Sequence, residues 1–216
     1  MANAKVAGMD IEGVGPTAST TYLGRALSLT EAHDTELHHR IAKAWAKFGI
    51  YRQELTDKQV PVHLRLKLFH CVVTPSLLYG SASWVLTSIR EQAVRSTQMK
   101  MIRAILAKKR IIHQAGEGND LQEPALETWV QWVQRVTAEA RVAMKQHSIP
   151  DWVAEQRKKV ATWITRLSKM ESHRWARQVL DWEPEGRRSR GHPCARWMDQ
   201  SSHVITLSPE GTQLRT

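Results

Sequence analysis

The sequence predicts a mainly α protein, in which a helical bundle follows a short β-hairpin and precedes further helices and a basic tail. Apolar residues recur at helical spacing through most of residues 30–180. In the first 29 residues, Gly8, Gly13, Gly15 and Pro16 interrupt the apolar positions, as in short strands and turns. Prolines suited to first helical turns stand at Pro61, Pro124 and Pro150. With 216 residues, of which 42% are hydrophobic, the chain can bury a core.

Residues 1–29 are expected to form short extended pieces, because their apolar positions are broken by glycine and proline. A helix is then expected from Thr30, where Glu31 and Asp34 suit the positive end of the helix dipole. Its apolar stripe is predicted to comprise Leu37, Ile41, Ala44, Trp45, Phe48 and Leu55, and its polar side Arg40, Lys43, Lys47 and Arg52.

The stretch from Val60 to Arg110 predicts two more helices. The first should begin near Pro61 and end or kink at Pro75, because proline removes an amide donor and clashes with the preceding turn. The second should begin near Ser88 and run to about Lys108. Its predicted apolar face comprises Met101, Ile102, Ile105 and Leu106. These lengths and short breaks favour an antiparallel bundle.

Further helices are expected downstream of a polar, glycine-containing linker. One should open at Pro124, one at Pro150 and a shorter one near His173. The predicted inner faces are Leu126, Trp129, Val130, Val133, Val136 and Ala140, then Trp152, Val153, Val160, Trp163, Ile164 and Leu167, with Arg157, Lys158 and Lys159 outside. Most of the nine tryptophans lie on such helices, where core packing is the favoured role.

This reading divides the chain into five segments. They are 1–29, a hairpin; 30–112, a helical bundle; 113–123, a linker; 124–181, a helical connector; and 182–216, a basic and largely irregular tail.

Positive charge is concentrated in one part of the chain. The net charge of +10 divides into 0 over residues 1–60, +8 over residues 61–112 and +2 over residues 113–216. A local excess of this size is expected of a surface that binds phosphates. A solvated basic face without a partner is the alternative.

Two blocks resemble a known family. The first contains VVTPSLLYG at residues 72–80, Trp84 and a basic helix that ends in ILAKKR at residues 105–110. The second comprises His173, Trp175, Trp182, Gly186, Arg188, Gly191, Pro193, Arg196, Trp197 and Asp199. Together they resemble the region after the catalytic palm in reverse transcriptases of non-LTR (LINE-like) retrotransposons, over about residues 20–200.

The resemblance implies the end of a palm, a thumb-like helical domain that holds an RNA or DNA primer-template, and a connector. Tyr22, Leu23 and Gly24 look like the hairpin that grips the primer end; a plain β-turn glycine is the alternative. The expected phosphate contacts are Lys100, Arg103, Lys108, Lys109 and Arg110, with a second, flexible set at Arg187, Arg188, Arg190 and Arg196.

The carboxylates of the polymerase reaction are expected to be absent. Two-metal catalysis needs clustered carboxylates, and in this family an adjacent aspartate pair supplies them. This chain has seven aspartates and no such pair. We therefore expect a non-catalytic carboxy-terminal piece or truncated copy, with no cofactor of its own; Mg²⁺ would belong to the missing palm of a longer polyprotein.

Other functions have less support. His192, Cys194 and His203 are too loosely spaced for a zinc site, and phosphate-loop and GxSxG motifs are absent. A helical protein-interaction module and a decayed transposon copy without selected activity remain alternatives. Two isolated cysteines, no secretory signal and no long apolar run favour an intracellular protein, nuclear or cytoplasmic, that is not secreted and has no membrane partner.

Overall fold

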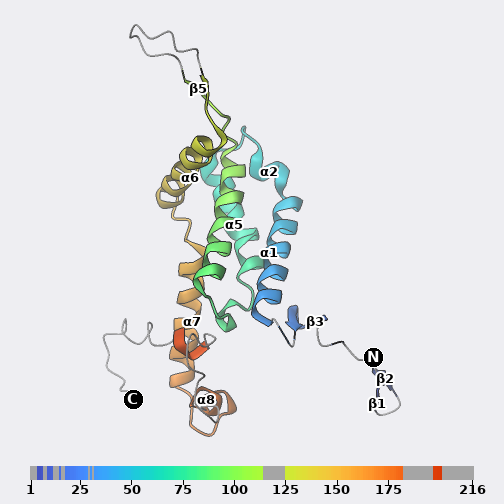
Figure 1. Cartoon of the computed structure of the whole chain (residues 1–216). Coiled ribbons are helices and arrows are strands. Elements are labelled where there is room, and N and C mark those ends of the chain that lie inside the picture. Colours follow the sequence, from blue (N-terminus) through green and yellow to red (C-terminus); the bar gives the residue numbers. More distant parts are fainter. Residues whose placement is uncertain are drawn as a thin grey trace, which may run out of the picture. The chain divides into compact units, whose positions relative to one another are not determined.

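The structure is a computed structural model that describes residues 4–6, 9–11, 15, 18–28, 30, 32–113, 125–181 and 197–200 (Figure 1). The predicted mainly α class, with an amino-terminal hairpin followed by helices, is confirmed. The longer helices are α1 (Ala32–Ile50), α3 (Val62–Val72), α5 (Ser88–Leu106), α6 (Trp129–Gln146) and α7 (Trp152–Ser168). The shorter ones are α2 (Arg52–Thr56), α4 (Thr74–Leu77), α8 (Trp175–Asp181) and the 3-10 turns η1 (Ser81–Ser83) and η2 (Trp197–Gln200).

The described strands form three separate antiparallel pairs. These are β1 (Ala4–Val6) with β2 (Met9–Ile11), β3 (Ser19–Tyr22) with β4 (Arg25–Ser28), and β5 (Ile112–His113) with β6 (Ala125–Leu126). Each pair has only two strands, so its stability depends on the elements that hold it.

The chain divides into two compact units. Unit 1 comprises Met1–His39, Tyr79–Glu91 and Val153–Thr216, and unit 2 comprises Arg40–Leu78 and Gln92–Trp152. The five segments expected from the sequence remain a prediction. Most of the expected linker and most of the expected tail lie outside the described residues.

Unit 2 is held together around the indole of Trp152, which is fully buried. Its ring stacks on Phe69 of α3, with 5.6 Å between the ring centroids, and its Nε1 donates to Thr74 Oγ1 at 2.9 Å. Gln98 of α5 completes the site: its Oε1 accepts from the Trp152 amide at 3.0 Å, and its Nε2 donates to the Pro150 carbonyl at 2.8 Å. Every polar group of this buried cluster therefore has a partner, as stable burial requires.

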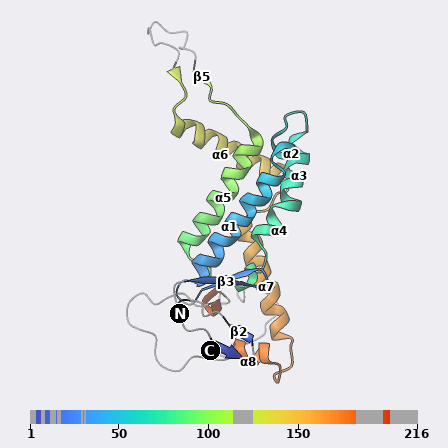
Figure 2. The ribbon, with the colours of Figure 1, turned by 90° about the vertical axis from the view of Figure 1, so that its right-hand side faces the viewer.

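A buried arginine joins α3 to the end of α5 in the same unit. Arg65 Nε donates to the Val60 carbonyl at 2.9 Å, and its Nη1 donates to the carbonyl of Ile105. The last carbonyls of a helix have no intrahelical partner, so this side chain satisfies one of them. The short helix α2 lies beside α3 within this unit (Figure 2).

Unit 1 is held by a two-point ion pair between α1 and α5. Arg90 donates to both carboxylate oxygens of Asp34 at 2.7 Å, and its Nη1 donates to the Val85 carbonyl at 3.0 Å. The hydrogen bond from Arg90 lowers the pKa of Asp34 below its usual value. From the sequence, Asp34 was expected only to interact with the positive end of the helix dipole of α1. The structure shows that it also pairs with Arg90.

The prediction that Arg40 lies on the polar side of α1 is wrong, because its side chain is only 6% exposed. The physical reason is helical spacing: Arg40 stands three residues after Leu37 and four before Ala44, so it shares their buried face. The apolar residues Leu37, Ala44 and Phe48 are buried as expected.

The predicted tryptophan packing is only partly correct. Trp84 and Trp152 are buried, but Trp129 is 64% and Trp175 82% exposed. The apolar stripe of α6 is continuous in sequence, yet the described structure buries it only at Val136, Ala140 and Met144, and Leu126 and Val130 are also exposed. Periodicity identifies a face, but it does not tell how much of that face a neighbour covers.

The start of α6 is also later than predicted. The helix begins at Trp129, and residues 125–126 form β6 instead of the first helical turn. Thr128 sets this boundary through a capping box: its Oγ1 accepts from the Gln131 amide, and the Gln131 side chain accepts from the Thr128 amide.

None of the helices in the described part of the chain combines the length and the hydropathy that a membrane-spanning segment needs.

Thr74→Val should destabilise the protein by about 1–3 kcal/mol, because it leaves the buried indole N–H of Trp152 without an acceptor. The measurement is the urea midpoint of unfolding. Thr162→Val is the control, since this hydroxyl is exposed and donates to the Lys158 carbonyl on its own helix; its change should stay within about 0.5 kcal/mol. Equal effects would show that the indole hydrogen bond does not stabilise the unit.

Candidate nucleic-acid interface

The most basic described segment follows the end of α5. The helix ends at Leu106, and Ala107 adopts the left-handed conformation with φ of 50°, which turns the chain out of the helix. Lys108, Lys109 and Arg110 follow and are exposed. We call these three residues the basic turn.

A buried carboxylate holds the chain beside the basic turn. Glu127 is 2% exposed and accepts from Arg135 Nε at 2.9 Å on one oxygen and from Arg135 Nη2 at 2.8 Å on the other. The Ile111 amide donates to the same carboxylate at 3.2 Å. The hydrogen bond to Glu127 raises the pKa of Arg135, so its guanidinium stays protonated throughout the ordinary pH range.

Side chains of α6 also bind the carbonyls of the basic turn itself. Trp132 Nε1 donates to the Lys108 carbonyl at 3.0 Å, and Arg135 Nη2 donates to the Lys109 carbonyl at 3.0 Å. Arg110 Nη1 donates to the Glu127 carbonyl at 3.3 Å. The backbone of the basic turn is therefore fixed, while its lysine side chains extend into solvent.

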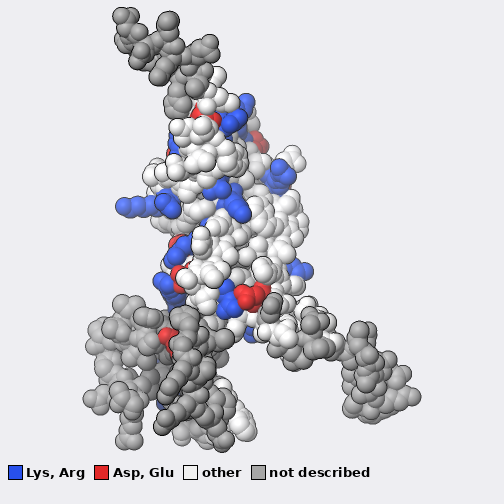
Figure 3. All heavy atoms as spheres, in the orientation of Figure 1, with Lys and Arg blue, Asp and Glu red and all other residues white. Residues whose placement is uncertain are grey.

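The five cations expected on this helix differ in their availability. Lys100 and Lys109 are exposed, and Lys108 is exposed but lies 3.6 Å from Glu139. Arg103 is half-buried and donates to Thr137 Oγ1 at 2.9 Å, and burial lowers its pKa. Figure 3 shows basic side chains as separate groups on neutral surface, with acidic side chains near several of them.

Tyr22, Leu23 and Gly24 form the end of the β3–β4 hairpin. Tyr22 pairs with Arg25, and the two turn residues both have positive φ, 48° at Leu23 and 78° at Gly24. Positive φ at both central residues is the type I′ geometry that matches the twist of paired strands. Tyr22 and Leu23 are 64% and 75% exposed, so their side chains are accessible to a partner.

Two residues of unit 1 hold this hairpin in place. Glu36 of α1 is almost fully buried and accepts from the Ala26 amide at 2.6 Å. Tyr79 donates its hydroxyl to the Leu23 carbonyl at 3.0 Å. The contact joins two parts of the family-like pattern that are far apart in the sequence, the turn at residues 22–24 and the VVTPSLLYG block.

The expected site residues thus fall into three groups. The hairpin end belongs to unit 1, and Lys100, Arg103 and the basic turn belong to unit 2. The expected tail contacts Arg187, Arg188, Arg190 and Arg196 lie outside the described residues.

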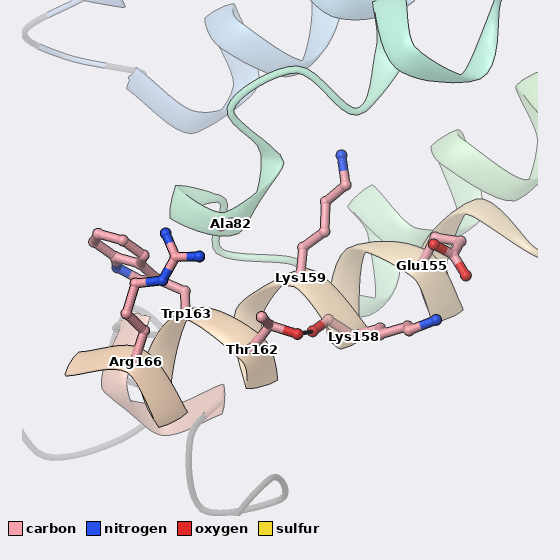
Figure 4. Close-up of a pocket in the computed structure, with 7 residues that line it drawn as sticks. All are labelled: Ala82, Glu155, Lys158, Lys159, Thr162, Trp163 and Arg166. Atoms are coloured by element: carbon pink, nitrogen blue, oxygen red, sulfur yellow. Dashed lines mark hydrogen bonds between the residues drawn. The ribbon is translucent and has the colours of Figure 1, made fainter. Parts of the chain in front are cut away.

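Sequence reasoning missed a hollow of about 310 Å³ on α7. Figure 4 shows its lining residues, which are Ala82, Glu155, Lys158, Lys159, Thr162, Trp163 and Arg166. Three cations against one carboxylate favour an anion there, and Trp163 supplies an aromatic wall. The sequence does contain a pattern that could have indicated this hollow. Its polar lining residues stand at intervals of three and four, which puts them on one helical face: Glu155, Lys158, Thr162 and Arg166.

Comparison with known proteins finds sequence similarity to a transposon-derived protein. The chain is 25% identical over 186 residues to an uncharacterized transposon-derived protein of Caenorhabditis elegans. That match covers 86% of this chain and 59% of the C. elegans protein, so the chain spans less than two thirds of its relative's length. No protein-family model and no solved structure match the chain. The similarity supports a relationship to transposon-derived proteins.

Glu127→Gln should loosen the basic turn, because the neutral amide keeps only one acceptor oxygen and turns an NH2 donor toward the donors of Arg135. We expect the Ile111 amide to exchange its hydrogen faster, by a factor equivalent to about 1–3 kcal/mol. Glu139→Gln is the control: this half-exposed carboxylate also pairs with Arg135, and its loss should cost less than about 1 kcal/mol. Equal exchange in both variants would exclude a positioning role for Glu127.

Leu23→Asn should stabilise the hairpin by a few tenths to about 1 kcal/mol, because asparagine tolerates positive φ better than leucine does. Little packing is lost, since Leu23 is exposed. Thermal unfolding measures the gain, and Gly24→Ala should shift stability in the opposite direction. A nucleic-acid affinity that falls while the hairpin becomes more stable would assign the leucine side chain to binding.

Proposed function

We propose that this chain is a nucleic-acid-binding thumb and connector of a retroelement reverse transcriptase, and that it binds primer-template duplex through phosphate contacts. The observation that carries the proposal is the basic turn, whose backbone is fixed by α6 while its two lysine side chains are exposed. A fixed backbone keeps the lysines within reach of a phosphate strand, so less conformational freedom is lost on binding.

The contacts expected from this site are electrostatic. Lysine ammonium groups bind phosphate as point charges and do not read base edges, so affinity should be largely independent of sequence. Released counterions supply much of the driving force, and affinity should therefore fall steeply with salt. Catalysis is not part of the proposal: the clustered carboxylates and Mg²⁺ of polymerisation would belong to a palm domain.

The hairpin end has a separate role in the proposal. Tyr22 and Leu23 would contact the primer end, and the hydrogen bonds from Tyr79 and to Glu36 would hold the turn that presents them. The exposed apolar side chains of the same hairpin also favour a second candidate function, docking onto a palm domain or another protein.

Charge reversal at Lys108, Lys109 and Arg110 tests the proposal. With a primer-template duplex, the triple glutamate variant should lose at least about tenfold in affinity, and its log–log salt slope should fall by about 2–3, close to one per lost phosphate contact. The matched control reverses the exposed lysines Lys43, Lys58 and Lys67, which changes the net charge of unit 2 equally.

The outcome separates the two candidate functions. Equal loss in both triple variants would show a nonspecific charge effect and contradict the proposed interface. A wild-type affinity that stays flat between low and physiological salt would contradict nucleic-acid binding itself. Binding of a palm domain that survives reversal of the basic turn would support the docking function alone.

A further inference from the structure

We propose that Trp129 is a stacking platform for one unpaired nucleobase, so that the interface binds the junction between duplex and single strand. This inference rests on the proposed function and specifies its ligand. The indole of Trp129 is 64% exposed although it lies in the first turn of α6, which is capped by Thr128. An indole this open to water leaves a large apolar surface unburied.

The ring of Trp129 is held in place by a second tryptophan. Trp132 stacks against it, with 4.8 Å between ring centroids and 28° between ring planes. Trp132 is in turn fixed by the hydrogen bond from its Nε1 to the Lys108 carbonyl. One indole therefore joins the exposed ring to the basic turn, and the platform is ordered before any ligand binds, which lowers the entropic cost of binding.

The charge beside the platform identifies the chemistry of its occupant. An exposed aromatic ring next to an apolar surface could equally receive an apolar side chain of another protein. Here the neighbouring segment is the basic turn, with three consecutive cations that a neutral apolar partner would leave unused. A nucleotide uses both features, because its base stacks on the ring and its phosphate meets the lysines. Since every base has a π face, the contact is tolerant of sequence.

Duplex ends and single-stranded overhangs distinguish this role from phosphate binding. Bases in a duplex are already stacked on each other and paired, whereas an unpaired base is free to stack on the ring. We therefore compare three probes: a blunt duplex, the same duplex with a short overhang, and that duplex with abasic sites in the overhang. Wild-type protein should bind the overhang duplex more tightly than the abasic one.

Trp129→Ala should weaken binding of the overhang duplex by about 5- to 100-fold, the usual effect of removing one aromatic stack. The affinities for the blunt and abasic duplexes should change less than about twofold. The dependence of affinity on salt should stay the same. Trp129→Phe should recover much of the loss because it restores a ring. Trp175→Ala, which removes an exposed indole on α8, is the matched control and should leave all three affinities unchanged.

Each other result overturns the inference in a recognisable way. Equal losses on all three probes for Trp129→Ala would mean that the ring only supports the basic turn. A change in oligomeric state by light scattering, with unchanged overhang binding, would make the platform a protein contact between copies of the chain. If wild-type protein binds none of the probes, the proposed function fails first and the platform fails with it.

Discussion

The buried carboxylate of Glu127 is the group on which the candidate interface depends. At 2% exposure it has lost its water, and an unpaired anion there would be very costly. Arg135 compensates both oxygens and, with the same guanidinium, binds the Lys109 carbonyl. The ion pair and the position of the basic turn therefore form one network. Trp132 extends it, because its ring contacts Trp129 and its Nε1 holds the Lys108 carbonyl.

Helical periodicity and turn residues predict those parts of the fold that depend on residues close together in the sequence. The apolar face at Met101, Ile102 and Ile105 is buried as its spacing predicts, since residues three and four apart share a helical face. The turn at Leu23 and Gly24 forms between two short strands, where a glycine allows positive φ. These features need no information about distant residues.

The site itself depends on contacts that no local pattern contains. Arg135 and Lys109 are 26 residues apart, and the expected linker with its glycines lies between them. The sequence offers several carboxylates and several arginines, and only the folded chain selects Glu127 and Arg135 as partners. The exposure of Trp129 has the same origin, because tryptophan at helical spacing is compatible with a core, an interface or a stacking surface until the neighbouring elements are known.

The net charge of +8 over residues 61–112 overstates the positive charge that is available to bind a polyanion. The reason lies in the different chemistry of arginine and lysine. All five arginines are engaged internally: Arg65 with the carbonyls of Val60 and Ile105, Arg90 with Asp34, Arg95 with Asp151, Arg103 with Thr137 and Arg110 with the Glu127 carbonyl. All four lysines, Lys67, Lys100, Lys108 and Lys109, are exposed. The planar guanidinium suits fixed, multi-point bonding inside the protein, and the hydrated ammonium stays in solvent. A surface built mainly from lysine attracts phosphate without reading sequence, so any discrimination between ligands must come from their shape, such as the presence of an unpaired base.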